Sequence, residues 1–232
     1  MKALVTAGSR GIGQSIADCL ADSGHDVAVV SRTDSIHRHY QYDLMLPNAP
    51  EAMVNEVIGS FGYPDILVHN LGGTLDITDP YCSPEDWKRV FRLNLGIAVE
   101  LNLRFVPTMQ DRGWGRVVHV SSVAGTENQG TVPYCAAKAA LNAYTRSFGR
   151  VVASDGVCVS AILPGAVYTE GGYWDRDVSY SETFAKQRMA IQRLGIPEEI
   201  GRFVAFLCSK DASFVTGSTF LVDGGQGRAF GL

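Results

Sequence analysis

The stretch Lys2-Ala3-Leu4-Val5-Thr6-Ala7-Gly8-Ser9-Arg10-Gly11-Ile12-Gly13 opens the chain and decides its fold. Its first five residues have the composition of a core strand, and the glycines follow at the point where a helix begins. Glycine lets the backbone approach an anionic group closely, while the helix N-terminus offers free N–H groups and a positive dipole. A glycine cluster between a first strand and a helix predicts a dinucleotide site formed by Gly8, Ser9, Arg10, Gly11, Ile12 and Gly13.

The same alternation of apolar, β-branched runs and longer helical stretches continues along the chain. Because the runs are continuously apolar, we expect strands buried on both faces, at residues 3–6, 27–31, 66–69, 116–121, 157–163 and 220–222. The expected helices are residues 12–23, 50–60, 84–110, 133–154 and 197–208, with Gly24, Gly62, Gly113 and Gly156 at helix ends. This pattern predicts a single α/β domain over residues 1–232, a Rossmann-type doubly wound parallel sheet flanked by helices.

Two segments interrupt the alternation. Residues 32–41 are too short and too polar for an amphipathic helix, so we expect an abbreviated second crossover. Residues 168–180 include Gly171, Gly172, Tyr173, Trp174 and Tyr180. Glycine hinges with aromatic side chains suit a mobile lid over an apolar pocket, and we expect residues 168–190 to form a substrate lid. A loop that packs its aromatic rings on the core is the alternative.

Composition and charge argue against several classes of function. The 232 residues are 46% hydrophobic and carry a net charge of −4, which is typical of a soluble globular domain. The mild acidity argues against nucleic acid as a partner, because phosphate binding needs a concentrated basic face. No apolar run reaches membrane-spanning length, and the first residues resemble a core strand rather than a signal peptide. We therefore expect a cytoplasmic protein with no membrane partner.

The cysteines and histidines give no sign of a metal site. The five cysteines are odd in number, scattered and without a Cys-x-x-Cys pair, which is typical of reduced thiols. His37 and His39 lie two residues apart in a polar stretch, where solvated side chains are more common than zinc ligands. The sequence therefore predicts no bound metal.

Tyr134 precedes Lys138 by four residues in the alanine-rich segment Pro133-Tyr134-Cys135-Ala136-Ala137-Lys138. Such a segment favours a helix, and residues four apart lie on one helix face. A free phenol has a pKa of about 10, and an adjacent ammonium would lower that pKa toward the range of a general acid/base. A tyrosine and a lysine at this spacing also occur as an ordinary surface contact. The pair therefore indicates proton transfer only together with the rest of the chain.

The end of the second expected strand bears on the choice of cofactor. Enzymes that use NAD usually place an acidic residue there, which accepts a hydrogen bond from the ribose 2′-hydroxyl. This chain has Ser31 and Arg32 instead, and Arg10 lies in the glycine loop. Two guanidinium groups would bind a 2′-phosphate, so we predict NADP(H) in preference to NAD(H), with two merely solvated arginines as the alternative. Asp43 is expected to accept a hydrogen bond from the adenine amino group.

Further motifs follow the glycine loop in a fixed order. They are His69-Asn70-Leu71-Gly72, Phe91-Arg92-Leu93-Asn94-Leu95, Ser121-Ser122-Val123-Ala124-Gly125, the Tyr134/Lys138 pair, Pro164-Gly165-Ala166-Val167-Tyr168-Thr169, Arg193-Leu194-Gly195-Ile196-Pro197-Glu198-Glu199-Ile200, Val215-Thr216-Gly217 and Val222-Asp223-Gly224-Gly225. Together with the glycine loop they resemble the motifs of the classical short-chain dehydrogenase/reductase family over almost the whole chain. Each motif alone is a weak signal, whereas all of them in order are specific.

The resemblance implies a mechanism and a role for single residues. Ser122 would donate a hydrogen bond to the substrate carbonyl oxygen, and Tyr134 would deliver a proton as hydride arrives from the nicotinamide. Lys138 would lower the pKa of Tyr134 and hold the nicotinamide ribose. Asn94 would kink its helix and hold a water that links the lysine to solvent, and Thr169 would bond the carboxamide. The family's other cofactor contacts match Asn70, Gly72, Val120, Pro164, Gly165 and Val167.

The chain departs from the family pattern at three places. Ala7 replaces the first fingerprint glycine, and we expect Gly8 beside it to supply the flexibility that the turn needs. His69 replaces an asparagine, so one internal hydrogen-bond pattern must differ. The loop after Ser122 is one residue shorter than usual, and counting by spacing would select Ser121 instead. The Ser-Val-Ala-Gly match favours Ser122, since neighbouring side chains on a strand point to opposite faces.

The leading hypothesis is an NADP(H)-dependent oxidoreductase that interconverts a ketone or aldehyde and an alcohol, with a small molecule as its partner. A 3-oxoacyl-(acyl-carrier-protein) reductase is the alternative within that class, although no lysine cluster is evident near the pocket. A non-catalytic NADPH-binding sensor is the alternative from another class, and the complete set of catalytic residues argues against it. The resemblance also implies a homotetramer or homodimer, built by pairing the two long helices and by packing C-terminal strands.

Overall fold

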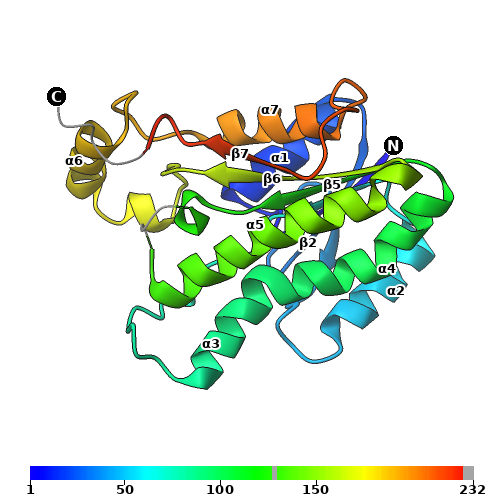
Figure 1. Cartoon of the computed structure of the whole chain (residues 1–232), viewed down its shortest axis with the longest axis horizontal. Helices are drawn as coiled ribbons and strands as arrows, with labels where there is room; N and C mark the ends of the chain where they lie inside the picture. Colours follow the sequence, from blue (N-terminus) through cyan, green and yellow to red (C-terminus); the bar gives the residue numbers. More distant parts are fainter. Residues whose placement is uncertain (127–129, 227–232) are drawn as a thin grey trace.

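Seven parallel strands form one sheet in the order β3-β2-β1-β4-β5-β6-β7 (Figure 1). The structure, a computed structural model, describes residues 1–126 and 130–226. Its strands are β1 (Lys2–Thr6), β2 (Asp26–Ser31), β3 (Arg38–Gln41), β4 (Ile66–His69), β5 (Gly115–Val120), β6 (Val157–Pro164) and β7 (Ser218–Val222). The strand order reverses between β1 and β4, which leaves a crevice beyond the carboxyl ends of these two strands.

Helices cover both faces of the sheet and give the molecule three layers (Figure 1). They are α1 (Gly11–Asp22), α2 (Ala49–Ser60), α3 (Pro84–Phe91), α4 (Ile97–Asp111), α5 (Val132–Val152), α6 (Val178–Arg188) and α7 (Pro197–Cys208). Helices α1 and α7 pack together on one face, while α2, α4 and α5 lie on the other. The predicted doubly wound parallel fold is therefore confirmed.

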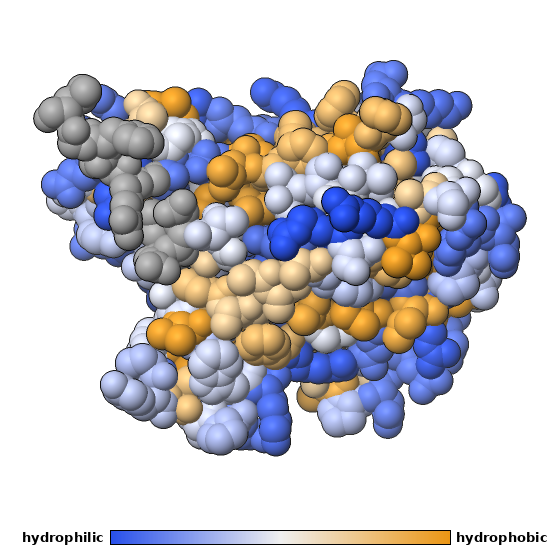
Figure 2. Space-filling model, in the orientation of Figure 1, coloured by the Kyte–Doolittle hydropathy of each residue, from blue (hydrophilic) through white to orange (hydrophobic). Residues whose placement is uncertain are grey.

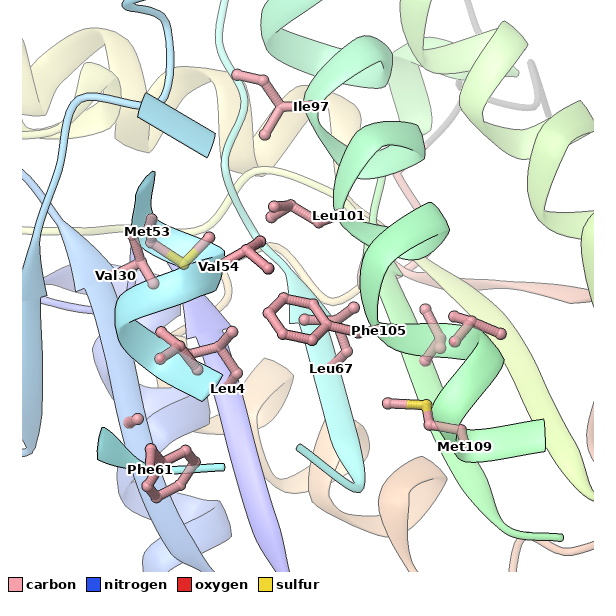
Figure 3. Packing of buried hydrophobic residues seen from close by; sticks show 14 of the residues in the cluster. Leu4, Val30, Met53, Val54, Phe61, Leu67, Ile97, Leu101, Phe105 and Met109 are labelled. Carbon is pink, nitrogen blue, oxygen red and sulfur yellow. The ribbon is translucent and has the colours of Figure 1, made fainter. Parts of the chain in front are cut away.

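Two apolar layers hold these helices on the sheet. In one layer Leu101 and Phe105 of α4 and Met53 of α2 pack over Leu4 and Leu67 of the strands, and all five side chains are fully buried (Figure 3). The other layer is formed mainly by Val5, Ile16, Leu20, Ile66, Ile200 and Val204. Burial of one such side chain stabilises the fold by roughly 1.5–3 kcal/mol. The sheet is thereby held rigidly between its helices, and its strand ends have fixed positions.

The predicted strands and helical regions all occur, and their ends lie where glycine indicated. Gly24, Gly62, Gly113 and Gly156 have φ between +67° and +88°, the left-handed conformation in which glycine ends a helix. One predicted helix, residues 84–110, is divided into α3 and α4 by a π-helical turn at Arg92–Gly96. Such turns are common at functional sites.

Two observed elements, β3 and α6, fall in segments for which neither a strand nor a helix was predicted. The edge strand β3 pairs with β2 and buries only Tyr40. Because the residues on either side of Tyr40 are polar, the sequence shows no run of apolar residues that would indicate a strand. The second crossover is thus abbreviated, as expected, because no helix separates β2 from β3. Helix α6 is capped by Asp177 and buries only Ser181 and Ala185. So few buried positions leave no visible helical period in the sequence.

Neither a membrane span nor a metal cluster is found in the part of the chain that the structure describes. None of the helices within residues 1–126 and 130–226 is both long and apolar enough to cross a bilayer. Over the same residues, no three His, Cys, Asp or Glu side chains gather in an arrangement that could hold a metal ion. The five cysteines are free thiols.

Ala7, which replaces the first fingerprint glycine, has a left-handed backbone with φ of +52°. Its N–H donates to the carbonyl of Val30 at 2.7 Å, and its own carbonyl accepts from Asn70 Nδ2 at 3.0 Å, so the conformation is held from both sides. The expectation that Gly8 relieves the turn is wrong. A Cβ on Gly8 would lie 3.0 Å from the Val29 side chain, so this glycine serves close packing instead. The strain stays on Ala7.

Replacing Ala7 by glycine should therefore stabilise the protein. The left-handed conformation costs an L-residue roughly 1–2 kcal/mol, and the greater freedom of glycine in the unfolded chain offsets part of the gain. We expect the free energy of unfolding to rise by about 0.5 kcal/mol, measured by urea denaturation. Ala139→Gly, at an exposed position inside α5, is the matched control and should lower the same quantity by about 1 kcal/mol. Equal destabilisation by both variants would contradict the assignment of strain.

Candidate active site

The carboxyl ends of β1, β4, β5 and β6 open into one cleft with a volume of about 370 Å³. Its walls come from the chain at or after the end of each strand: residues 7 and 10–13 after β1, 70 and 72 after β4, 120–122 at the end of β5, and 164, 165 and 169–172 at the end of β6. Tyr134 and Lys138 of α5 complete the lining. The parallel sheet therefore brings together groups that are far apart in the sequence.

The start of α1 lies directly against the strand ends. Asn70 Nδ2 donates to the carbonyl of Ala7, and the backbone N–H of Asn70 donates to Thr6 Oγ1 at 3.1 Å. A Cβ on Gly13 would collide with both the Ala7 carbonyl and the Asn70 amide. Arg10, the first residue before α1, lines the cleft beside this contact. A helix N-terminus with a glycine cradle and an arginine fits the diphosphate of a dinucleotide.

Ser31, at the end of β2, is turned inward. Its side chain is buried, its hydroxyl donates to the carbonyl of Thr33 at 2.7 Å, and it lies 2.8 Å from Nε2 of His39. Because the hydroxyl already donates, the His39 ring nitrogen is the donor in the second bond. Ser31 therefore shapes the turn after β2 rather than facing the cleft.

Arg32 follows Ser31 and is well exposed. Its guanidinium lies 4.0 Å from the carboxylate of Asp43, with 73% and 36% of the two side chains accessible. An exposed pair at this distance contributes well under about 1 kcal/mol, so Arg32 is free to turn toward a ligand. The hydroxyls of Ser9 and Thr33 lie 2.9 Å apart and join the glycine loop to this turn. Arg32 and the glycine loop thus lie at the same end of the molecule.

Ser122 and Tyr134 face each other across the cleft. Ser122 Oγ accepts a hydrogen bond from the backbone N–H of Ala124 at 3.1 Å, which leaves its own proton to donate. Burial raises the pKa of Tyr134, and a hydrogen bond with the Ser122 side chain partly offsets this rise. Ser121 points toward α5, where its hydroxyl donates to the carbonyl of Lys138 at 3.3 Å. The two neighbouring serines thus point in different directions, and Ser122 is the one that bonds with the phenol.

Lys138 is almost fully buried, and its ammonium donates to the carbonyl of Val120 at 2.8 Å. Burial lowers the pKa of Lys138 to about 7. Its Nζ lies 5.7 Å from the centre of the Tyr134 ring. The expectation that this lysine lowers the phenol pKa is wrong for this structure, in which the pKa of Tyr134 is raised. Removal from water is the largest cause of this rise, and burial also lowers the pKa of the lysine itself.

Asn94 lies inside the π-helical turn, as the expected kink required, and is almost fully buried. Its Nδ2 donates to the carbonyls of Val90 at 2.9 Å and Gly73 at 2.8 Å, and its Oδ1 accepts from the Gly73 N–H at 3.0 Å. A Cβ on Gly72 would lie 2.8 Å from Asn94 Oδ1 and 2.9 Å from Lys138 Nζ. Gly72 therefore keeps open the space where the asparagine and the lysine converge.

The structure brings most of the predicted residues into the cleft. Predicted residues that line it are Arg10, Gly11, Ile12, Gly13, Asn70, Gly72, Val120, Ser122, Tyr134, Lys138, Pro164, Gly165 and Thr169. Those that do not line it are Gly8, Ser9, Ser31, Arg32, Asp43, Asn94 and Val167. Glu170 also lines the cleft, although no role was predicted for it. Its place directly after Thr169 is the signal that could have identified it.

Comparison with known proteins places the chain in a family. A family model described as enoyl-(acyl carrier protein) reductase matches residues 6–226. The acetoacetyl-CoA reductase of Rhizobium meliloti is 37% identical and covers 97% of both chains. The 3-oxoacyl-(acyl-carrier-protein) reductase of Vibrio cholerae is 36% identical, over 97% of this chain and 96% of its own. L-Sorbose reductase from Gluconobacter frateurii, solved with NADPH and L-sorbose, superposes with a TM-score of 0.88 at 29% identity, over 97% of this chain and 95% of its own.

The chain belongs to the short-chain dehydrogenase/reductase family. It is an oxidoreductase of that family, which acts on keto and CH–OH groups. The resemblance deduced from the ordered motifs is thus confirmed over nearly the whole chain.

Gly72→Ala should inactivate the enzyme without unfolding it. The new methyl group would meet only the far ends of the Asn94 and Lys138 side chains, which can shift and lose their positions. We expect ketone reduction to fall at least about tenfold, while the melting temperature changes by less than about 3 °C. Gly73→Ala is the matched control, because its Cβ would meet nothing closer than Leu93 at 3.9 Å. Equal activity of the two variants would show that the space at Gly72 is not needed.

Proposed function

We propose that the protein is an NADPH-dependent reductase of a small ketone or aldehyde, with Tyr134 as the proton donor. The observation that carries the proposal is the convergence of Ser122, Tyr134 and Lys138 on a cleft whose other end has a glycine cradle and Arg10. When bound, a nicotinamide cofactor would supply the hydride. The chain's own groups would hold the carbonyl and supply the proton.

In this mechanism Ser122 orients and polarises the carbonyl oxygen. Its hydroxyl is steadied by the Ala124 N–H and keeps a proton to donate. Tyr134 then gives its proton to the developing alkoxide. The raised pKa of Tyr134 supports this direction, since the phenol is protonated at neutral pH and ready to act as an acid. The reverse reaction, alcohol oxidation, would need the phenolate and should be slower near neutral pH.

Lys138 and Asn94 would serve proton supply and cofactor positioning. Lys138, with a pKa of about 7, can gain or lose a proton under working conditions. Asn94 fixes the Gly73 backbone beside it through two hydrogen bonds and donates a third to the carbonyl of Val90. Lys138 would hold the nicotinamide ribose, with Asn70, Gly72 and Val120 beside it, and Thr169 would bind the carboxamide, as implied by the family motifs. Pro164, Gly165 and Val167 would support that end of the cleft.

The preference for NADP(H) over NAD(H) rests on two arginines and on the absence of an acidic residue at the end of β2. Ser31 ends that strand with its side chain buried, and Arg32 follows with its guanidinium exposed. Arg10 is exposed at the mouth of the glycine loop. Both guanidinium groups can approach a 2′-phosphate, which binds them through charge-assisted hydrogen bonds. Asp43 would accept a hydrogen bond from the adenine amino group once Arg32 turns to the phosphate.

Arg10→Ala and Arg32→Ala should each weaken NADPH binding selectively. A charge-assisted hydrogen bond contributes about 1.5–3 kcal/mol, so we expect the Kd of NADPH to rise about tenfold or more and that of NADH to change by less than about threefold. Fluorescence titration measures both. Arg89→Ala, which removes an exposed arginine of α3, is the control for the change in net charge. Preference of the wild-type protein for NADH would overturn the assignment.

The substrate is proposed to be a small ketone, although the two curated relatives are named for acyl thioesters of coenzyme A and acyl carrier protein. Glu170 is the charged residue that the lid contributes to the cleft lining, and the sequence from Leu71 to Cys82 carries two aspartates and no lysine or arginine. Acidic residues at and near the cleft disfavour an acidic carrier. The solved relative that was crystallised with L-sorbose shows that the fold can hold a neutral sugar. A 3-oxoacyl-(acyl-carrier-protein) reductase remains the second candidate on account of the 36% identity.

Tyr134→Phe should abolish turnover and leave cofactor binding intact. The test is NADPH oxidation with L-sorbose, a cyclic ketone and acetoacetyl-CoA as alternative substrates. Loss of the proton donor should reduce the rate at least about 100-fold, since general acid catalysis contributes about 10²–10⁴-fold. Tyr42→Phe, which removes a hydroxyl bonded to Glu56 at the surface, is the control. Wild-type protein that binds NADPH but reduces none of the substrates would favour the non-catalytic sensor.

Residues 168–190 are proposed to close over the substrate as one unit. The rings of Trp174 and Tyr180 lie nearly parallel, at 4°, and Phe184 packs 4.5 Å from Trp174. This aromatic cluster holds the segment together, while Gly171 at φ of +65° provides a hinge beside the cleft. The lid would belong to the same domain as the rest of the chain, so that residues 1–232 would act as one catalytic domain.

A homotetramer or homodimer is proposed on the basis of exposed apolar surface. Helix α4 exposes Leu103, and α5 exposes Val132 and Val151. Figure 2 shows apolar side chains gathered across the face that these helices form. Pairing this face with that of a second copy would remove the apolar surface from water.

A further inference from the structure

A chain of buried hydrogen bonds joins four elements below the cleft. His69 Nε2 lies 2.8 Å from Asn102 Oδ1, and Asn102 Nδ2 lies 3.2 Å from His119 Nε2. His119 Nδ1 lies 2.9 Å from Thr145 Oγ1, which donates to the carbonyl of Leu141 at 2.8 Å. The four linked side chains are at most 4% exposed. This set, His69, Asn102, His119 and Thr145, is called the buried polar chain below; it connects β4, α4, β5 and α5.

The bonding partners fix the tautomer of each ring. Thr145 donates its proton to Leu141, so it can only accept from His119, which must carry a proton on Nδ1. His119 Nε2 then accepts from the Asn102 amide. The carbonyl oxygen of Asn102 in turn accepts from His69 Nε2–H. Every donor in the chain meets an acceptor when both rings are neutral. A second proton on His119 would lie on Nε2 and point at the Asn102 amide, so that two donors would face each other.

The buried polar chain lies about two helical turns below the active-site contacts. Asn94 and Asn102 are eight residues apart, and Lys138 and Thr145 are seven apart, which corresponds to about 10–12 Å along a helix. Helix α4 is tied to β4 by the bond between Asn102 and His69, and the π-helical turn before α4 is tied by Asn94 to Gly73, in the segment after β4. Helix α5 is tied to the end of β5 by Lys138 and by Thr145.

Three consecutive residues of the β5 end hold α5. His119 donates to Thr145, the carbonyl of Val120 accepts from the Lys138 ammonium, and Ser121 donates to the carbonyl of Lys138. A shift of the His119 ring would therefore move the next two residues and the lysine with them. The stacking of His119 on His69, at 5.1 Å between ring centres, steadies the ring from the side of β4.

The surroundings of the two rings keep them uncharged. Burial lowers the pKa of His69 to about 4 and that of His119 well below its ordinary value, and the charges of His69 and Lys138 lower the latter further. The titratable groups that face His119 are His69 from β4 and Lys138 and Tyr144 from α5, while α4 contributes the uncharged Asn102. Burial raises the pKa of Tyr144, so this group is neutral as well.

We propose that Asn102, His119 and Thr145 are positioning residues of the active site, which fix the end of β5 against α5 and keep the region below Lys138 free of a second positive charge. The proposal rests on the function proposed above, because it concerns the lysine of that site. The three residues would explain why Lys138 lies where it does and why its charge state is not disturbed. A displaced or charged His119 would change both.

Thr145→Val, compared with Thr145→Ser, tests this role. Valine has the shape of threonine but cannot accept from His119, whereas serine keeps the hydroxyl. We expect Thr145→Val to lower kcat at least about fivefold with a KM for NADPH within about twofold, and to shift the titration midpoint of Lys138 by at least about 0.5 pH unit. Thr145→Ser should restore both. The midpoint is followed by NMR of the labelled lysine side chain, which needs no substrate.

A second pair of variants covers the case in which Thr145→Val does not fold. Asn102→Asp replaces the amide donor by a carboxylate, which should draw a proton onto His119, and NMR of the ring nitrogens should then show an imidazolium near neutral pH. Asn55→Asp, exposed on α2, is the charge-matched control and should leave both rings neutral. The wild-type spectra should show the Nδ1–H tautomer of His119 and the Nε2–H tautomer of His69.

The outcomes separate this proposal from the proposed function. An active wild-type enzyme whose Thr145→Val variant loses stability but keeps the kcat and the Lys138 midpoint would overturn the positioning role and leave the function intact. Wild-type protein that reduces no ketone would overturn the function. In that case the tautomers and the Lys138 midpoint still decide whether the buried polar chain controls the lysine, and the opposite tautomer of His119 would overturn it.

Discussion

The hydrogen bond from the Lys138 ammonium to the carbonyl of Val120 is the contact on which the active site depends. It joins the helix that carries the proton donor to the strand end that carries Ser122. An amine this deeply buried loses the hydration of its charge, which is why its pKa falls to about 7. Only a helix pressed firmly on the sheet can keep such a group in place, so the packing of α5 on β6 and β7 is itself a condition for the site.

Much of the fold follows from local sequence because its signals are local. Continuous apolar runs identify buried strands, and the glycines at helix ends have the positive φ that explains their choice. The ordered motifs identify the strand ends that meet at the cleft, so the lining could be predicted with few omissions. The two elements that were not predicted, β3 and α6, bury one and two side chains respectively. A sequence shows the hydrophobic period of a strand or helix only where several residues of one face are buried.

The features that could not be predicted depend on partners far away in the chain. Ser31 turns inward because its hydroxyl bonds the ring of His39, which is eight residues on and pairs with Val29 in the sheet. The histidine at position 69 is explained by its hydrogen bond to Asn102, which lies 33 residues away in the sequence. Nor does helical spacing measure burial: it placed Lys138 beside Tyr134 correctly, yet reversed the direction of the phenol's pKa shift. Spacing determines which groups meet, and solvent exclusion determines how they behave.

The two pKa shifts together explain how such a pair can serve as an acid. A lysine whose pKa is lowered to about 7 holds its charge less firmly near neutral pH than an ordinary lysine, so it stabilises a phenolate only weakly while the site is closed to water. Tyr134 therefore keeps its proton until an acceptor arrives, and the Ser122 hydroxyl helps to create that acceptor by polarising the carbonyl. A second charge below the lysine would upset this balance. The uncharged pair of histidines in β4 and β5 maintains it.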